Sequence, residues 1–214
     1  MAGTDGPQSD EKRRGHSWFA ALYDPLCKTE ERGSMGRRRD ELLRAVEGDV
    51  IEIGAGTGAN FSHYSPRARV VAFEPDPFMR VRAEKKLAEL ARSNIEVRQA
   101  PAEEIPLPDS SCDTAVSTLV LCTVADVPRA LAEMKRVLRP SGELRFIEHI
   151  RGDGARGHVQ DLIKPVWRWF AAGCNPNRRT EDAMRQAGFE IVSLKRGTLV
   201  PWLVPVITGV ARPR

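Results

Sequence analysis

The stretch Val50-Ile51-Glu52-Ile53-Gly54-Ala55-Gly56-Thr57-Gly58 decides the fold. A short apolar run suited to a buried strand is followed at once by three glycines at alternate positions, and a turn of this kind leads into a helix in doubly wound α/β sheets. Ligands of such sheets bind beyond the carboxyl ends of the strands, where Gly54 and Gly56 allow a tight turn and close backbone approach. We therefore expect an α/β sheet with a cofactor at this loop.

The sequence on either side of the loop alternates between expected strands and helices. Apolar runs predict strands at 70–73, 95–98, 113–121 and 143–149, and helical spacing predicts helices at 37–46, 77–90 and 127–138. Gly48 is placed to end the first of these helices, and Asp76 with Pro77 to begin the second. In that second helix, Met79, Val81, Leu87 and Leu90 are expected to form the buried face.

The carboxyl-terminal part breaks the alternation. An amphipathic helix is expected at 158–172, followed by two strands at 189–194 and 204–210 that suit an antiparallel edge hairpin. The predicted fold is a doubly wound, Rossmann-like, seven-stranded sheet, mostly parallel. We expect a disordered arm over 1–12 and one domain over 13–214, with N-terminal lid helices at 13–47 and a substrate-cap insertion at 150–180.

Two adenosine-containing cofactors compete for the glycine loop, NAD(P) and S-adenosylmethionine. Glu74, at the end of the second expected strand, suits a ribose diol in either case, since an acid about 20 residues after the loop is typical of such sites. Dinucleotide sites read GxGxxG around a pyrophosphate, whereas this loop reads GxGxG. The acidic Glu52 suits a cationic cofactor and would repel phosphates, which favours S-adenosylmethionine.

The motifs resemble those of class I S-adenosylmethionine-dependent methyltransferases of the methyltransferase type 11 group. The resemblance runs from about Tyr23 to the C-terminus and is carried by segments 52–58, 73–76, 100–106, 111–119 and 134–142. It implies cofactor contacts from the following residues: Tyr23, Glu52, Gly54, Ala55, Gly56, Thr57, Gly58, Glu74, Pro75, Met79, Pro101, Ala102, Glu103, Thr118 and Leu119. Pro101 departs from the family, which has an adenine-binding Asp there, so Glu103 or the backbone N–H of Ala102 is left to contact the ring.

Within that group the chain is similar to bacterial relatives of the microsomal alkyl-thiol methyltransferases. The segments concerned are 23–26, 148–150, 173–175, 201–202 and the helix with Trp167 and Trp169. The microsomal members carry an apolar N-terminal anchor, and because this chain shows none, a soluble cytoplasmic member is expected.

The resemblance makes an apolar thiol the first expectation for the methyl acceptor. His149, at the end of the fifth expected strand, is the candidate general base, because a neutral imidazole can take a thiol proton near pH 7. Capping the strand is the alternative role for His149. Trp167 and Phe170 are candidate walls of an apolar acceptor pocket, although an aromatic stripe is more often plain core, and the same helix also suits a membrane surface.

Other functions follow less well from the residues. O- or N-methylation of a natural product, quinone or lipid-like acceptor stays open, as does a non-catalytic binding module. The Pro-Pro motif of nucleic-acid amine methylation is absent after the fourth strand, where Ser117-Thr118-Leu119-Val120 stands, and the net charge of +4 is mild, so no nucleic-acid partner is expected. The four cysteines lack CxxC spacing and paired histidines, so no metal site is expected, and Cys112 and Cys122 are expected to be buried. The sequence does not indicate the oligomeric state.

Overall fold

The computed structural model describes residues 33–170, 173–199 and 204–214. The arm at 1–12, Tyr23 and most of the expected lid lie outside these residues. The described strands are β1 Gly48–Ile53, β2 Ala68–Phe73, β3 Ile95–Arg98, β4 Cys112–Thr118, β5 Leu138–His149, β6 Phe189–Thr198 and β7 Pro205–Pro213. The described helices are α2 Ser34–Leu43, α3 Pro77–Leu90, α4 Val127–Val137, α5 Ala155–Phe170 and α6 Thr180–Gln186.

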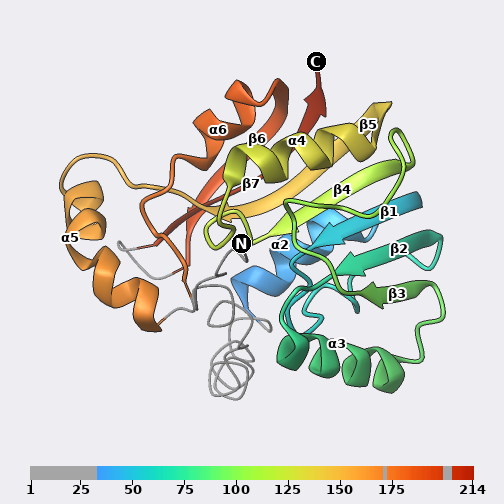
Figure 1. Cartoon of the computed structure of the whole chain (residues 1–214). Helices are drawn as coiled ribbons and strands as arrows, with labels where there is room; N and C mark the ends of the chain where they lie inside the picture. Colours follow the sequence, from blue (N-terminus) through green and yellow to red (C-terminus); the bar gives the residue numbers. More distant parts are fainter. Residues whose placement is uncertain (1–32, 171–172, 200–203) are drawn as a thin grey trace, which may run out of the picture.

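All seven strands form one sheet in the order β3-β2-β1-β4-β5-β7-β6 (Figure 1). The first five strands pair in parallel, whereas β7 pairs antiparallel with β5 and with β6. The predicted Rossmann-like sheet with an antiparallel carboxyl-terminal hairpin is confirmed. The order reverses between β1 and β4, so the switch point of the sheet lies at the glycine loop.

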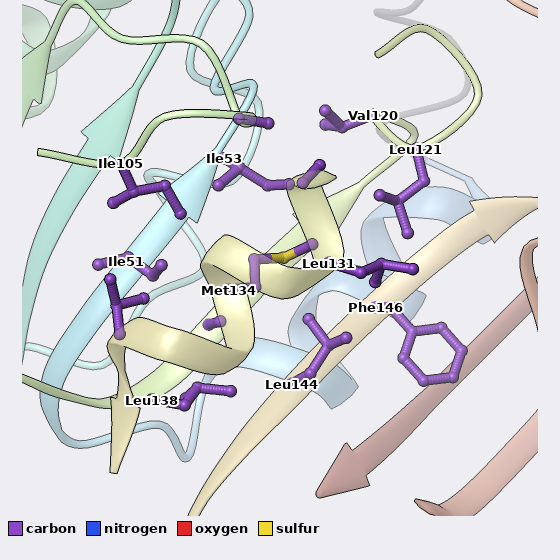
Figure 2. Packing of buried hydrophobic residues seen from close by; sticks show 14 of the residues in the cluster. Ile51, Ile53, Ile105, Val120, Leu121, Leu131, Met134, Leu138, Leu144 and Phe146 are labelled. Atoms are coloured by element: carbon purple, nitrogen blue, oxygen red, sulfur yellow. The ribbon is translucent and has the colours of Figure 1, made fainter. Parts of the chain in front are cut away.

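Two apolar clusters cover the two faces of the sheet, with α4 and α6 on one face and α2 and α3 on the other (Figure 1). Leu131 and Met134 of α4 lie over Ile51 of β1 and Leu144 of β5 in the first cluster (Figure 2). Neighbouring residues of β1 belong to opposite clusters, since Val50 packs with α2 and α3. A parallel strand buried on both faces needs this continuous apolar run, which is why β1 was readable from the sequence.

Helix α3 has the predicted N-cap but only part of the predicted buried face. Asp76 caps it, because its Oδ1 accepts hydrogen bonds from the N–H groups of Phe78 and Met79 at 2.8 and 3.2 Å, as predicted. The expected buried face is wrong in part, since Val81 is 59% and Leu90 is 37% exposed. Ala83 is buried instead, because a small side chain lets the helix lie close to the sheet.

Several expected boundaries also differ. Gly48 does not end α2, which stops at Leu43; with φ of 78° it begins β1. Strand β4 ends at Thr118 rather than 121, because Leu119 takes a left-handed φ of 59°. Strand β5 begins at Leu138, with a register shift opposite Cys112 to Thr114 in place of the expected free turn. Helix α6 has no counterpart among the expected elements. Within the described ranges, none of the helices combines the length and the apolarity needed to cross a membrane.

Candidate active site

The glycine loop after β1 lies at the carboxyl edge of the sheet and takes a left-handed backbone. Gly54, Gly56 and Gly58 have φ of 60°, 58° and 80°. A Cβ on Gly54 would collide with Val120 and one on Gly58 with Phe61, so packing demands glycine at both positions. At Gly56, by contrast, no atom of the described residues lies within 4 Å of where a Cβ would be. The loop thus presents bare backbone to open space at its middle glycine, which suits close approach of a ligand.

Glu74 connects the end of β2 to this loop. Its Oε2 accepts a hydrogen bond from the N–H of Gly56 at 2.8 Å, and its Oε1 accepts one from the N–H of Asp76 at 2.8 Å. Burial raises the pKa of Glu74, although both backbone donors oppose that shift. The carboxylate is therefore held beside the open face of Gly56, where hydroxyl groups of a ribose suit its remaining lone pairs.

Glu52 lies beneath the loop in a buried polar network. Its Oε1 accepts from Asn60 Nδ2 at 2.8 Å and its Oε2 accepts from the Tyr64 hydroxyl at 2.9 Å. Asn60 in turn accepts a hydrogen bond from Arg39. Burial raises the pKa of Glu52 to about 7, against the lowering effect of Tyr64, Asn60 and Arg39. The direct contact of Glu52 with a cationic cofactor stays a prediction, and both carboxylate oxygens of Glu52 already accept hydrogen bonds from Asn60 and Tyr64, which hold the loop.

The same network reaches the end of β4. Asn60 Nδ2 lies 3.1 Å from Thr118 Oγ1, and the N–H of Leu119 donates to the carbonyl of Ile147 at 2.7 Å. The left-handed Leu119 turns the chain there, so that Val120 lies against Gly54. The structure therefore brings Glu52, Thr118 and the loop to one edge.

The residues expected at the adenine end lie along neighbouring loops. Ala102 and Met79 are buried, and Pro101 is exposed. Glu103 Oε1 accepts from the N–H groups of Ala125 and Asp126 at 2.8 and 3.1 Å, just before α4. Because these donors already occupy that oxygen, Glu103 has less capacity for an adenine amino group than the sequence suggested.

A second cluster lies at the ends of β4 and β5 and unites three residues distant in sequence. One ligating atom each of Cys122, His149 and Cys174 lies within 4.8 Å of the others. The Sγ of Cys174 lies 3.7 Å from Nδ1 of His149, and both cysteines are buried free thiols. We call these three residues the cysteine–histidine cluster. The expectation that Cys112 and Cys122 are buried is confirmed.

The pKa values of the two cysteines of this cluster are shifted in opposite directions. The pKa of Cys174 is lowered, first because the thiol of Cys122 lies beside its sulfur and then because His149 does. The pKa of Cys122 is raised for the same reason, and burial adds to that shift. Nε2 of His149 is buried and has no hydrogen-bond partner among the described residues, so His149 is directed at sulfur rather than used as a strand cap through its ring.

The backbone around the cluster is held by the segment between α5 and α6. Asn175 donates to the carbonyl of Cys122 through its N–H at 2.8 Å and through Nδ2 at 3.1 Å. The Arg178 guanidinium donates to the carbonyls of Leu121 and Val124, and Thr180 Oγ1 donates to the carbonyl of His149 at 3.1 Å. The cluster therefore rests on a hydrogen-bonded frame.

Glu148, next to His149 on β5, is fully buried, and its carboxylate contacts the end of β4. Its Oε1 accepts from Ser117 Oγ at 2.5 Å and from the N–H groups of Val120 and Leu121 at 3.2 Å each. Burial raises its pKa to about 7, against these donors. Glu148 thereby holds the turn at Val120 and Leu121, which directly precede Cys122.

Of the candidate pocket walls, Trp167 lies on α5 and is half-buried. Its Nε1 is buried with no hydrogen-bond partner in the described part of the chain, yet it is near enough to Cys174 to favour the thiolate. The side chain of Phe170, like Tyr23, lies outside what the structure describes. Sequence reasoning missed Asn60, Tyr64, Glu148 and the pairing of Cys122 with Cys174, because each acts through contacts between distant segments.

Comparison with known proteins places these features in context. Residues 51–146 match the family model described as a methyltransferase domain. The human thiol S-methyltransferase TMT1B is 32% identical over 197 residues, which cover 81% of this chain and 81% of that protein. Phosphatidylethanolamine N-methyltransferase from Cereibacter sphaeroides is 34% identical over 151 residues, or 70% of this chain and 72% of that one. The crystal structure of a SAM-dependent methyltransferase, possible histamine N-methyltransferase, from Thermotoga maritima superposes with a TM-score of 0.66 at 25% identity, over 92% of this chain and 96% of that chain.

Proposed function

We propose, because the chain belongs to the S-adenosylmethionine-dependent methyltransferase family, that it transfers the methyl group of this cofactor to the sulfur of an apolar small-molecule thiol. Membership in the family identifies the methyl donor and the reaction class. The acceptor is our inference. It rests on similarity over four fifths of the chain to thiol S-methyltransferases and on the site at the end of β5.

The residues at the loop fit the cofactor. The open space over Gly56 leaves room for it, and the adjacent carboxylate of Glu74 supplies acceptors for ribose hydroxyls. We propose that the loop residues 54–58, with Thr118 and Leu119 at the end of β4, hold the methionine end. We propose that Met79 and Ala102 line the adenine end.

When bound, the cofactor supplies a methyl group on a sulfonium, which a thiolate displaces in line. The chain's own task is to align the acceptor and to remove its proton. We propose that His149 is the group around which this deprotonation is organised, since it lies at the carboxyl end of β5 beside Cys174. Trp167, on α5 beyond that edge, is our candidate wall for the acceptor.

The observation that carries the thiol assignment is the similarity to thiol S-methyltransferases over four fifths of the chain, and the groups at the end of β5 are compatible with it. Two buried free thiols and an imidazole lie together at the carboxyl ends of β4 and β5. Free buried cysteines also suit a reducing compartment, so we expect the enzyme to act in the cytoplasm.

N-methylation of a lipid-like amine is the second candidate, because the chain is also similar to a phosphatidylethanolamine N-methyltransferase. A primary amine needs deprotonation as well, so the site alone does not separate the two. The acceptor sulfur or nitrogen must be identified directly.

A methyl-transfer screen across thiols, phenols, amines and aminophospholipid vesicles tests the assignment. Release of S-adenosylhomocysteine is scored for the wild-type chain, with Gly56→Val as the cofactor-binding control. We expect turnover with alkyl or aryl thiols and a thioether product by mass spectrometry. Turnover restricted to amines or phenols would overturn the thiol assignment and leave the family intact.

A further inference from the structure

The geometry of the cysteine–histidine cluster matches that of a metal site. Zinc bonds of about 2.0–2.3 Å at tetrahedral angles place neighbouring ligand atoms about 3.5–3.8 Å apart. The Sγ of Cys174 and Nδ1 of His149 are 3.7 Å apart, and the Sγ of Cys122 completes a triangle whose sides are all within 4.8 Å. Three candidate ligand atoms therefore lie close enough together for a small adjustment of the side chains to let them share an ion.

The frame around the cluster provides the stiffness that a metal site needs. Two of the three ligands have their own backbone carbonyl held by another residue: Asn175 donates to the carbonyl of Cys122, and Thr180 donates to that of His149. Cys174 directly precedes Asn175, so the same clamp positions it. Ligands held in this way lose little conformational freedom when an ion binds.

The donor set selects the ion and leaves one position open. Two thiolates and an imidazole are soft and borderline ligands, which favour Zn²⁺ over the oxygen-seeking Mg²⁺ and Ca²⁺. The described residues place three ligating side chains here, and three protein ligands are the pattern of catalytic rather than structural zinc. Two thiolates also neutralise Zn²⁺, so that the ion with its three protein ligands carries no net charge before an acceptor binds.

We propose that Cys122, His149 and Cys174 bind Zn²⁺ and that the fourth position of the ion takes the sulfur of the acceptor thiol. This inference rests on the proposed thiol acceptor. On coordination the acceptor's S–H bond breaks and its proton goes to solvent. The thiolate then forms the S–CH₃ bond as the methyl group's bond to the sulfonium sulfur breaks, and that electron pair stays with S-adenosylhomocysteine. The uncharged thioether is a weaker ligand than the thiolate and leaves the ion. In this arrangement His149 is a metal ligand, and the ion, rather than the imidazole, lowers the pKa of the acceptor thiol.

Metal content tests the site independently of activity. Full-length protein purified under reducing conditions is expected to hold about one zinc per chain, as read by plasma mass spectrometry. Cys122→Ser and Cys174→Ser should each lose most of it. Cys112→Ser is the matched control, since Cys112 is equally buried but donates to the carbonyl of Val137, away from the cluster, and should keep the ion. Zinc-free wild-type protein, a Cys122–Cys174 disulfide in its place, or equal zinc in Cys174→Ser would overturn the proposal.

Cobalt substitution of the wild-type chain avoids variants that fail to fold. Replacing the ion with Co²⁺ should give thiolate-to-metal charge-transfer absorption and the visible bands of a tetrahedral site. Adding an acceptor thiol should change those bands, whereas the corresponding methyl thioether should not. Visible bands that stay unchanged when the thiol is added would overturn the proposal that the acceptor binds at the fourth position of the ion.

The outcomes also separate this inference from the function on which it rests. Thiol methylation that survives complete removal of metal by a chelator would overturn the zinc site and leave the thiol acceptor standing. A site that binds zinc, in a protein that methylates only amines, would overturn the proposed acceptor and with it the role of the fourth position.

Discussion

The glycine loop with Glu74 and the cysteine–histidine cluster lie at the same edge of the sheet but are built in different ways. The loop is one continuous segment whose property resides in its backbone, with three left-handed glycines. The cluster gathers side chains from three separate segments, and the segment after α5 must fold back to complete it. A backbone site is thus specified locally, whereas a side-chain site depends on the whole sheet.

The difference predicts which changes each site tolerates. At the loop, a side chain added to a glycine should weaken cofactor binding even where the fold has room for that side chain. At the cluster, loss of a single side chain should remove chemistry while cofactor binding persists. The following substitutions test that contrast in order of decreasing effect.

Gly56→Val should have the largest effect. The side chain enters open space, so the fold survives, but it occupies the face that the cofactor approaches, and we expect the Kd for S-adenosylmethionine to rise at least about 100-fold, or roughly 2.7 kcal/mol. The left-handed backbone adds strain of about 1–2 kcal/mol. Calorimetric titration and thermal unfolding measure the two effects.

Gly154→Val is the matched control for backbone strain. Gly154 has φ of 55°, and no atom of the described residues lies within 4 Å of where its Cβ would be, yet it precedes α5 rather than the loop. It should lose similar stability and keep its cofactor affinity. Equal loss of binding in both variants would show that strain, not contact, explains the result at Gly56.

His149→Ala should break the other site alone. We expect thiol turnover to fall about 100-fold, in the range for a lost proton-transfer group or metal ligand, with the cofactor Kd within about twofold of wild type. Steady-state assays and calorimetry on the same preparation check both. Full turnover at neutral pH would rule out every role proposed for His149.

Glu52→Gln should change how stability depends on pH. The pKa of Glu52 is about 7 in the folded chain, above its ordinary value, so the folded state holds the proton more tightly. Stability from this group is therefore present at low pH and is lost as the pH rises through the folded pKa of about 7. We expect the free energy of unfolding of the variant, taken relative to that of wild type, to be larger at pH 8 than at pH 5 by on the order of 2 kcal/mol. Denaturant unfolding of both proteins at both pH values measures this difference.

Tyr64→Phe gives the opposite sign for the same carboxyl. The Tyr64 hydroxyl lowers the pKa of Glu52, so its removal should steepen the loss of stability with rising pH. A pH dependence that neither substitution alters would mean that Glu52 does not titrate in this range.

Glu74→Gln should have the smallest of these effects. The amide keeps one acceptor oxygen but loses the charge that strengthens hydrogen bonds to ribose hydroxyls, so a Kd increase of about 10-fold is expected. Glu96→Gln is the control, because Glu96 on β3 is exposed and pairs with Arg98. An unchanged Kd in Glu74→Gln would place the ribose elsewhere.

The contrast between the two sites also explains what was predictable from the sequence. The strands around β1 and the cap at Asp76 are encoded by neighbouring residues and were found. The exposure of Val81 was missed, because helical spacing shows an apolar stripe but not how near the sheet lies. The cysteine–histidine cluster was missed, since sequence rules for metal sites recognise pairs such as CxxC and cannot detect side chains that only the fold brings together.

The strand order carries a final consequence, for the order in which the chain folds. Strand β6 precedes β7 in the chain but lies outside it in the sheet, so it has no neighbour in the sheet until β7 has docked. Until then the edge of β5 is unpaired along its length, His149 included, because Val206 of β7 is its partner in the register. Such a late, long-range pairing slows folding and leaves an aggregation-prone edge exposed. We therefore expect the chain to be most prone to aggregate during folding before β7 pairs with β5.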